Sequence, residues 1–155
     1  MIEQPDFGNG FHRTDDRPLR YMLRSGENRM HDLFYLASFI HEARFRVRDI
    51  AAADGRFSLR MTRVRWELLR HRNDLSDIAS TLTVSHVRHF RLHSGWPFPS
   101  RRELEIRDLC LFDGVLHLRT TFGFLELTMT LSSSSRVVLC DSPPSGGASS
   151  VPRNS

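Results

Sequence analysis

Residues 46–68 read RVRDIAAADGRFSLRMTRVRWEL, and residues 105–127 read EIRDLCLFDGVLHLRTTFGFLEL. In both stretches an Asp-Gly pair separates two segments in which apolar and polar residues alternate. Alternation with a period of two is typical of a strand with one buried face, and Asp-Gly is a strong signal for a two-residue hairpin turn. Each stretch therefore predicts an antiparallel β-hairpin, and these two hairpins decide the fold class.

The two stretches align with each other without a gap. In each copy the apolar phase changes at an Arg-Asp pair, and such a change within a strand predicts a β-bulge. If each Asp-Gly closes a two-residue turn, Asp49 lies opposite Arg60 and Asp108 lies opposite Arg119, so each copy carries a cross-strand ion pair. The match has two explanations. Residues 46–68 and 105–127 are copies of one internal repeat, or they are two unrelated hairpins that look alike because each turns at Asp-Gly. Both alternatives predict two similar hairpin units.

A short helix is predicted before the first hairpin. Apolar residues recur with helical spacing from Met30 to Ala37, and Asn28 is a favourable N-cap. Asp32 lies in the first turn, where the helix dipole favours a negative charge. The pattern ends near residues 39–41.

Other segments contribute further strands. Residues 81–92 are rich in Thr, Val and aromatic side chains, and residues 125–131 alternate cleanly, so both are predicted strands. Residues 137–140 predict a short last strand. The polar residues 70–80 are expected to form a loop.

Together these elements predict a mainly β (α+β) fold: an antiparallel sheet or small sandwich built from two similar hairpin units, with one short N-terminal helix. Residues 1–27 show no sustained period and are expected to form an arm, and 28–140 form one β-rich domain. Residues 141–155 are almost entirely Ser, Pro and Gly around one valine, which cannot offset the entropy of ordering. They are predicted to be a disordered tail.

The composition excludes several classes of protein. The chain of 155 residues suits one domain, and no apolar run approaches the roughly 20 residues of a membrane helix. Acidic Glu3 and Asp6 and the absence of an apolar run near the start predict no secretory signal, so we expect a cytoplasmic protein with no membrane association. Cys110 and Cys140 lack the spacing of a zinc or redox site and are expected to be reduced.

Arginine supplies the candidate binding site. All 22 basic residues are arginine, and the net charge is +4. A GC-rich genome that encodes arginine in place of lysine would give the same composition. In that case the arginine-rich face of the sheet would be solvated and would have no binding role. Clustered arginines also suit an acidic protein surface or a phosphate backbone, although aromatic side chains are not interleaved as in many single-strand binders. The candidate partner-binding residues cluster on and beside the first hairpin: Arg44, Arg46, Arg48, Arg56, Arg60, Arg63 and Arg65.

No pattern in the sequence indicates catalysis or a cofactor. The chain contains no nucleophile elbow, no P-loop and no His-Glu-x-x-His motif. His86, His89 and His93 would share one face of a helix, but the strand predicted over these residues separates the first two. We therefore expect no catalytic residues, no cofactor and no bound metal.

Residues 36–45 read LASFIHEARF and precede the first hairpin. This stretch resembles the "SFLHDA" opening of small bacterial β-rich proteins, some of which are immunity proteins of polymorphic toxin systems, with Glu42 where that opening has Asp. The resemblance implies that Phe39 and Ala43 pack between helix and strand, that His41 and Glu42 cap the helix end, and that the protein binds a partner without catalysing a reaction.

The sequence thus predicts a cytoplasmic bacterial module of non-enzymatic function, of the immunity type or a subunit of a bacterial complex. It would bind a protein with an acidic surface through the arginine-rich hairpin, or associate with another chain or with itself through a sheet edge. The alternative is a nucleic-acid-binding protein that uses the arginine-rich face of the sheet.

Overall fold

The computed structural model describes residues 17–23, 29–68, 76–94, 102–121 and 125–143. Within these ranges the chain forms ten strands, one α-helix and two short 3-10 helices. In chain order they are β1 (Arg20–Met22), α1 (Arg29–Ile40), β2 (Arg44–Arg46), η3 (Val47–Asp49), β3 (Ile50–Ala53), β4 (Arg56–Val64), η4 (Trp66–Leu68), β5 (Asp77–Ser85), β6 (His89–Ser94), β7 (Glu103–Phe112), β8 (Val115–Thr120), β9 (Leu125–Thr130) and β10 (Arg136–Asp141).

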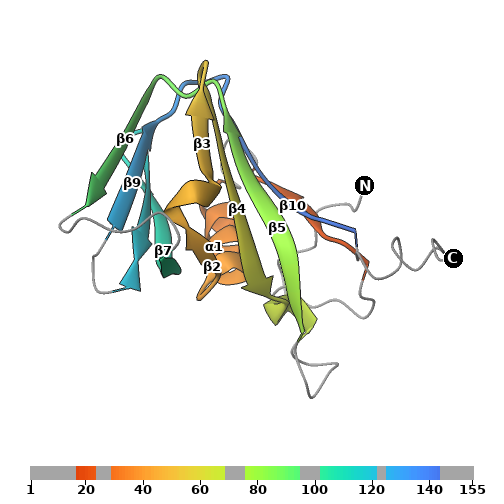
Figure 1. Ribbon diagram of the computed structural model, residues 1–155. Coiled ribbons are helices and arrows are strands. Elements are labelled where there is room, and N and C mark those ends of the chain that lie inside the picture. Colours follow the sequence, from red (N-terminus) through yellow and green to blue (C-terminus); the bar gives the residue numbers. More distant parts are fainter. Residues whose placement is uncertain (1–16, 24–28, 69–75, 95–101, 122–124, 144–155) are drawn as a thin grey trace, which may run out of the picture.

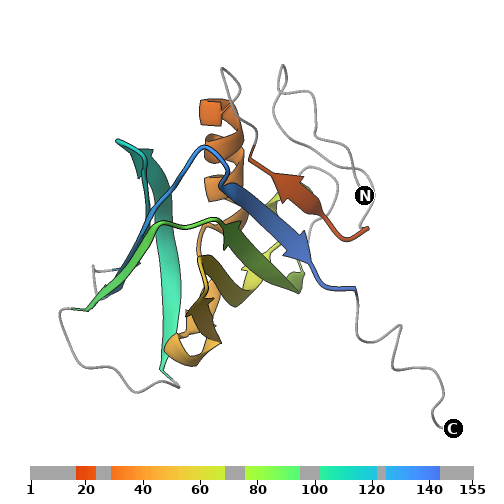
Figure 2. The same cartoon turned by 90° about the horizontal axis from the view of Figure 1, so that it is seen from above.

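All strands belong to one antiparallel sheet, in the order β1-β10-β5-β4-β2-β7-β8-β9-β6. Strand β3 pairs with β4 outside this path. The sheet is strongly curled: β10, β5 and β4 form one half, β7, β9 and β6 form the other, and α1 lies between the halves (Figures 1 and 2). The predicted mainly β fold with one helix is confirmed for the described residues, as an open, curled sheet rather than a sandwich.

The core fills the space between the two halves. Leu36 and Ile40 of α1 are fully buried, as are Leu59 of β4 and Leu118 of β8, and all four belong to one continuous apolar cluster. Complete burial of such a side chain contributes about 1.5–3 kcal/mol. The helix therefore holds the two halves of the sheet together by filling the angle between them.

The helix ends where the sequence predicts. Helix α1 stops at Ile40, the backbone N–H of Ala43 donates to the Ile40 carbonyl, and Glu42 has a left-handed backbone with φ 64°. The predicted N-cap, Asn28, lies outside the described residues. Asp32 does lie in the first turn, but it is fully buried and accepts a hydrogen bond from the Tyr21 hydroxyl at 3.0 Å. Asp32 therefore connects α1 to β1.

Both predicted Asp-Gly turns are confirmed. Asp54 and Gly55 have φ values of 56° and 75°, and Asp113 and Gly114 have 53° and 76°. Two successive positive φ angles define the type I′ turn, whose twist matches that of the strands it joins. The strands on either side pair directly after each turn, as predicted.

The predicted phase changes take two different forms. In the second hairpin the register shifts between Ile106 and Asp108, a β-bulge as expected. In the first hairpin the 3-10 turn η3 interrupts the strand instead. The aligned stretches diverge after the hairpins, because Glu67 lies in η4 whereas its counterpart Glu126 lies in β9.

Of the two predicted cross-strand pairs, the first forms its ion pair although Asp49 lies in η3, and the second has the predicted register without an ion pair among the described residues. Asp49 lies 3.7 Å from the Arg60 guanidinium. Asp108 is the register partner of Arg119, yet Arg119 donates to Glu126 at 3.3 Å. The Asp108 Oδ1 atom is buried and makes no hydrogen bond within the described part of the chain.

The strand predicted over residues 81–92 is in fact two strands. Strand β5 begins at Asp77, within the predicted loop, and ends at Ser85, and β6 begins at His89. His86 has a positive φ of 55° at the break. The break is necessary because β5 pairs in one half of the curled sheet and β6 pairs with β9 in the other.

The domain also extends further than expected at both ends. Strand β1, within the expected arm, pairs with β10. Asp141, assigned to the expected tail, is the last residue of β10 and is buried, and the Ser142 N–H donates to the Ala79 carbonyl. Residues 144–155 lie outside the described part.

The turn geometry predicts the effect of alanine at the two glycines. A Cβ at Gly114 would meet no atom within 4 Å, and one at Gly55 would lie at ordinary contact distance, 3.5 Å, from the Val87 carbonyl oxygen. We therefore expect Gly55→Ala and Gly114→Ala each to lower the free energy of unfolding by about 1–2 kcal/mol, from left-handed backbone strain alone. Urea denaturation measures this; Asp54→Asn and Asp113→Asn, which tolerate positive φ, are controls with little effect. Unchanged stability in both alanine variants would contradict the assignment of type I′ turns.

Candidate functional site

Five of the seven predicted arginines are exposed or partly exposed on β2, η3 and β4, whereas the other two are buried. Side chains of β4 alternate, so that Phe57 and Leu59 are buried whereas Arg56 and Arg60 are exposed. The same alternation operates in β2, where Phe45 is buried between two more exposed arginines. We call the resulting surface the arginine face; it consists of Arg44, Arg46, Arg48, Arg56 and Arg60.

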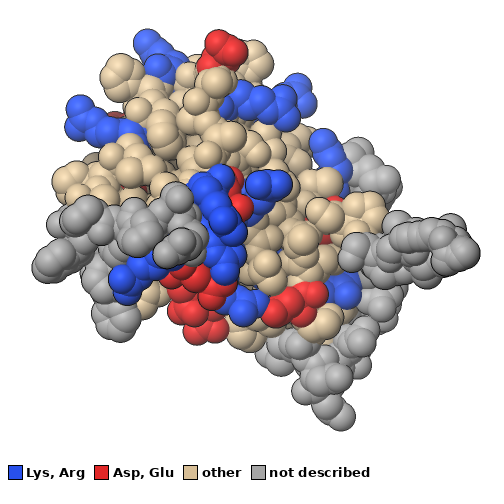
Figure 3. All heavy atoms as spheres, viewed as in Figure 1, with Lys and Arg blue, Asp and Glu red and all other residues tan. Residues whose placement is uncertain are grey.

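Three of these arginines have acidic partners at the surface. Arg44 forms an ion pair and hydrogen bond with Asp77. Arg46 lies 3.8 Å from Glu103 on β7, in addition to the pair between Asp49 and Arg60. In Figure 3, arginine and carboxylate side chains accordingly lie next to one another at the centre of the face shown. Solvent-exposed pairs of this kind contribute little to stability and are easily exchanged.

Arg48 and Arg56 differ from the other three. Both side chains are exposed, and neither makes a hydrogen bond or ion pair within the part of the chain that the structure describes. They are therefore the least neutralised positions of the arginine face.

The remaining two predicted residues, Arg63 and Arg65, do not belong to this surface. Arg63 has no exposed area, and Arg65 is 8 % exposed. The side chain of Arg63 follows Phe57, Leu59 and Met61 on the inward face of β4. Assigning Arg63 and Arg65 to partner binding is thus at odds with their burial.

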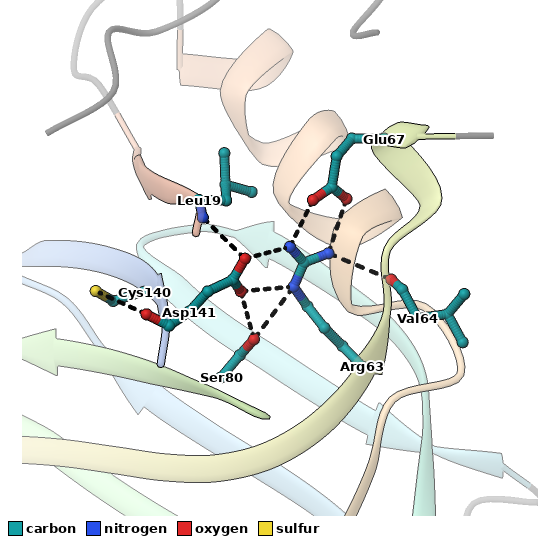
Figure 4. A network of polar contacts seen from close by, with 7 residues as sticks. All are labelled: Leu19, Arg63, Val64, Glu67, Ser80, Cys140 and Asp141. Carbon is teal, nitrogen blue, oxygen red and sulfur yellow. Dashed lines mark hydrogen bonds and ion pairs between the residues drawn. The ribbon is translucent and has the colours of Figure 1, made fainter. Parts of the chain in front are cut away.

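Arg63 is the centre of a buried polar network (Figure 4). Its Nε and Nη2 atoms donate to the two carboxylate oxygens of Asp141 at 2.9 and 2.8 Å. Its Nη1 and Nη2 atoms donate to the two oxygens of Glu67 at 2.9 and 2.7 Å. The Ser80 hydroxyl and the Leu19 backbone N–H also donate to Asp141, at 2.5 and 2.9 Å. The network therefore joins β4, η4, β5, β10 and the residue that precedes β1.

The network favours the ionised forms of Arg63 and Asp141. Burial alone lowers the pKa of Arg63, but hydrogen bonds and the charges of Glu67 and Asp141 outweigh it and raise that pKa above its ordinary value. Burial alone raises the pKa of Asp141, but the Arg63 guanidinium, Ser80 and the Leu19 N–H lower it below its ordinary value. Because all these groups are buried, the arrangement is structural rather than catalytic.

The polar groups of the second hairpin form a separate surface cluster. Glu126 lies 3.0 Å from the Nδ1 atom of His117 and also accepts the bond from Arg119. The hydrogen bond with His117, and then that with Arg119, lower the pKa of Glu126 although partial burial opposes them. The carboxylate therefore offsets the positive charge of Arg119 at this surface.

The residues of the "SFLHDA"-like stretch lie at the junction of α1 and β7. Phe39 and Ala43 are buried, as the resemblance implied. The His41 Nδ1–H donates to the Arg107 carbonyl at 3.2 Å, and the Glu42 N–H donates to the Ile106 carbonyl at 2.9 Å. An open pocket of about 320 Å³ lies beside these residues.

The histidine spacing gives no metal centre in the described part of the chain. His86 lies between strands, and His89 and His93 are exposed on β6. Among the described residues, no three His, Cys, Asp or Glu side chains are grouped so that they could hold a metal ion. Cys110 and Cys140 are both free thiols, as predicted.

A second pocket, of about 240 Å³, lies between the first hairpin and β6. Its lining includes Ala52 of β3, Phe57 of β4 and Phe90 of β6. The two phenylalanine rings stack with centroids 5.5 Å apart. Sequence reasoning missed this pocket, because no local pattern indicates that β6 returns to the first hairpin.

Comparison with known proteins gives no further assignment. No protein family model matches the chain, and no curated protein and no solved structure shows significant similarity to it. In the described part of the chain, no helix is both long enough and apolar enough to cross a membrane.

The buried network predicts a large loss of stability when one partner is removed. We expect Asp141→Asn or Arg63→Met to lower the free energy of unfolding by about 3–5 kcal/mol, because each leaves buried charge unpaired. Arg60→Met, on the same strand but exposed, is the matched control and should cost less than about 1 kcal/mol. Urea denaturation distinguishes the two; a loss at Arg63 as small as that at Arg60 would contradict the structural role of the network.

The lowered pKa of Asp141 predicts acid sensitivity. A carboxyl group whose pKa is lower in the folded than in the unfolded state contributes stability above the unfolded value, about 4 for Asp. That contribution is lost as the pH falls through the folded value. We expect the urea midpoint to fall steeply below about pH 4 in the native chain and less steeply in Asp141→Asn. Parallel profiles for the two proteins would show that Asp141 does not contribute.

Proposed function

We propose that this chain is a non-enzymatic protein-binding module whose arginine face binds an acidic surface of another protein. The observation that carries the proposal is the exposure of Arg48 and Arg56 without an ion pair in the described part of the chain. Guanidinium groups bind carboxylates through two parallel hydrogen bonds, so exposed arginines on a rigid sheet suit an acidic partner.

The surface ion pairs support this mode of binding. Asp77 and Glu103 hold the Arg44 and Arg46 side chains at the surface of β2 without burying them. A partner carboxylate can therefore compete for, or share, guanidinium groups that are already oriented. Such complementary charges raise association rates and determine which partner is accepted.

The same acidic groups disfavour the alternative, a nucleic-acid interface. Asp49, Asp77 and Glu103 are interleaved with the arginines and would repel a continuous phosphate backbone. On the outward face of β4, Ser58 lies between Arg56 and Arg60 and Thr62 follows Arg60, so this face has no aromatic side chain on which a base could stack. A protein surface with its own mixture of charges suits this pattern better.

The proposed setting is the bacterial cytoplasm, where the chain would act as an immunity-type protein or as a subunit of a complex. The resemblance of residues 36–45 to the "SFLHDA" opening motivates this part of the proposal. Neither role requires a cofactor.

Charge reversal tests the proposal. We expect the double variant Arg48→Glu and Arg56→Glu to retain about one tenth or less of the partner that the native chain captures from its host, because attraction becomes repulsion. The matched control is Arg107→Glu with Arg136→Glu, two exposed arginines outside the arginine face. Quantitative co-purification at constant salt measures the effect.

Two results would contradict the proposal. One is equal capture of the partner by both double variants. The other is retention of the native chain on a DNA or RNA column, with release that depends steeply on salt and on Arg48 and Arg56, which would favour the nucleic-acid alternative.

A further inference from the structure

Strand β3 has an open edge within the sheet. It pairs with β4 on one side, and its backbone makes no hydrogen bond to any other described strand. In Figure 1 it stands at the top of the molecule, between β4 and the half of the sheet that contains β6. An open edge presents unpaired N–H and C=O groups that can pair with another extended chain.

This edge lacks the side chains that usually protect one. Strand β3 consists of Ile50 followed by three exposed alanines, Ala51–Ala53. The strand at one end of the sheet order, β6, instead carries Arg91 and two histidines on its short length. Proteins commonly place charged residues or proline on edge strands to prevent pairing, and β3 has neither.

The second pocket lies beside this edge on the inward side. Ala52 is the register partner of Phe57, so both side chains are on the same face of the hairpin. Both line the pocket, together with Val87 and Phe90. An added strand would place the residue opposite Ala52 on this face, where an apolar side chain could enter the pocket.

Two exposed arginines lie near the edge. Arg56 and Arg88 line the same pocket and are exposed. Arg56 is the register partner of Ala53, so no large side chain stands between its guanidinium and a strand added to β3. The acidic residue Asp54, in the turn, balances only part of this positive charge.

We propose that β3 is a strand-addition site for an extended acidic segment of the partner, in which one large apolar side chain is flanked by Asp or Glu. The apolar side chain enters the pocket beside Ala52, Val87 and Phe90. The flanking carboxylates bind Arg56 and Arg88. The inference rests on the proposed function and names the part of the partner that is recognised.

Charge selects this occupant over a second copy of the chain. Pairing of β3 with β3 of another molecule would bring two sets of Arg56 and Arg88 together around an edge with one Asp54 per copy. Like charges at close range are unfavourable, whereas an acidic segment neutralises them. Main-chain hydrogen bonds would supply affinity, and the pocket would supply specificity.

The probe is a fluorescent synthetic peptide of about ten residues, the length of a strand with its flanks, with a central Leu between Glu residues. We expect fluorescence anisotropy to show binding to the full chain, and hydrogen exchange of amides in Ala51–Ala53 to slow on binding. A peptide with Lys in place of Glu should not bind. N-methylation of two successive central amides, one of which must face β3, should weaken binding by about tenfold or more.

Variants of the protein complete the test. Ala52→Phe fills the pocket from an exposed position and should weaken binding of the Glu-Leu-Glu peptide by about tenfold. Arg56→Glu with Arg88→Glu should do the same by reversing the charge. Arg136→Glu, an exposed arginine on β10, is the control and should leave binding unchanged. Thermal unfolding of each variant shows that the fold is retained.

The outcomes separate this inference from the proposed function. Binding that is insensitive to N-methylation and to Ala52→Phe overturns strand addition, while leaving an interaction at the arginine face intact. Strand addition is overturned in the same way if capture of the host partner is lost in a variant of Arg48 but unchanged in Ala52→Phe. A concentration-dependent dimer that Ala52→Phe abolishes identifies a second copy as the occupant and overturns the acidic segment.

Discussion

The fold depends on one buried cation, the guanidinium of Arg63. Its N–H groups donate to two buried carboxylates, Glu67 and Asp141, and to the partly buried backbone carbonyl of Val64 (Figure 4). Phe39 of α1 lies under the same guanidinium, 5.9 Å from its centre. A charge enclosed in this way is tolerated only while every partner is in place. Arg63 therefore requires that η4, the end of β10 and helix α1 occupy fixed positions around β4.

That requirement explains why the ends of the domain are ordered. Strand β10 reaches Asp141 because this carboxylate is needed beside Arg63, and β1 follows because the Leu19 N–H donates to the same carboxylate. The segment before β1 and the end of β10 are thus joined through the Asp141 side chain. The opposite half of the sheet, from β7 to β6, contributes no residue to the network and is held instead by apolar packing on α1.

Sequence reasoning succeeded where the determinants are local. An Asp-Gly pair specifies the turn, and the turn specifies the register, so that Asp49 and Arg60 could be paired in advance. The burial of Arg63 was within reach of the same reasoning, because the alternation of Phe57, Leu59 and Met61 places the next residue of that period inside. The alternation of Val137 and Leu139 likewise leads to Asp141.

Other features depend on contacts between distant segments and have no local signal. The break at His86 follows from the curl of the sheet, which sends β5 and β6 to opposite halves. The pocket beside β3 exists only because Phe90 returns to stack on Phe57. Strand propensity alone predicts one continuous strand over residues 81–92, because Thr, Val and aromatic side chains favour strands on both sides of the break.

Arginine serves two different purposes in this chain, and period-two alternation decides which. On the outward side of β4, Arg56 and Arg60 are solvated, and a lysine could carry the same charge there. On the inward side, Arg63 donates to two carboxylates at once through a planar fork, which the three donors of an ammonium group cannot reproduce. A genomic bias toward arginine can therefore account for the exposed positions without accounting for Arg63. Whether the surface can bind an acidic partner depends on its exposed arginines without an ion pair. The total number of arginines in the chain does not measure this.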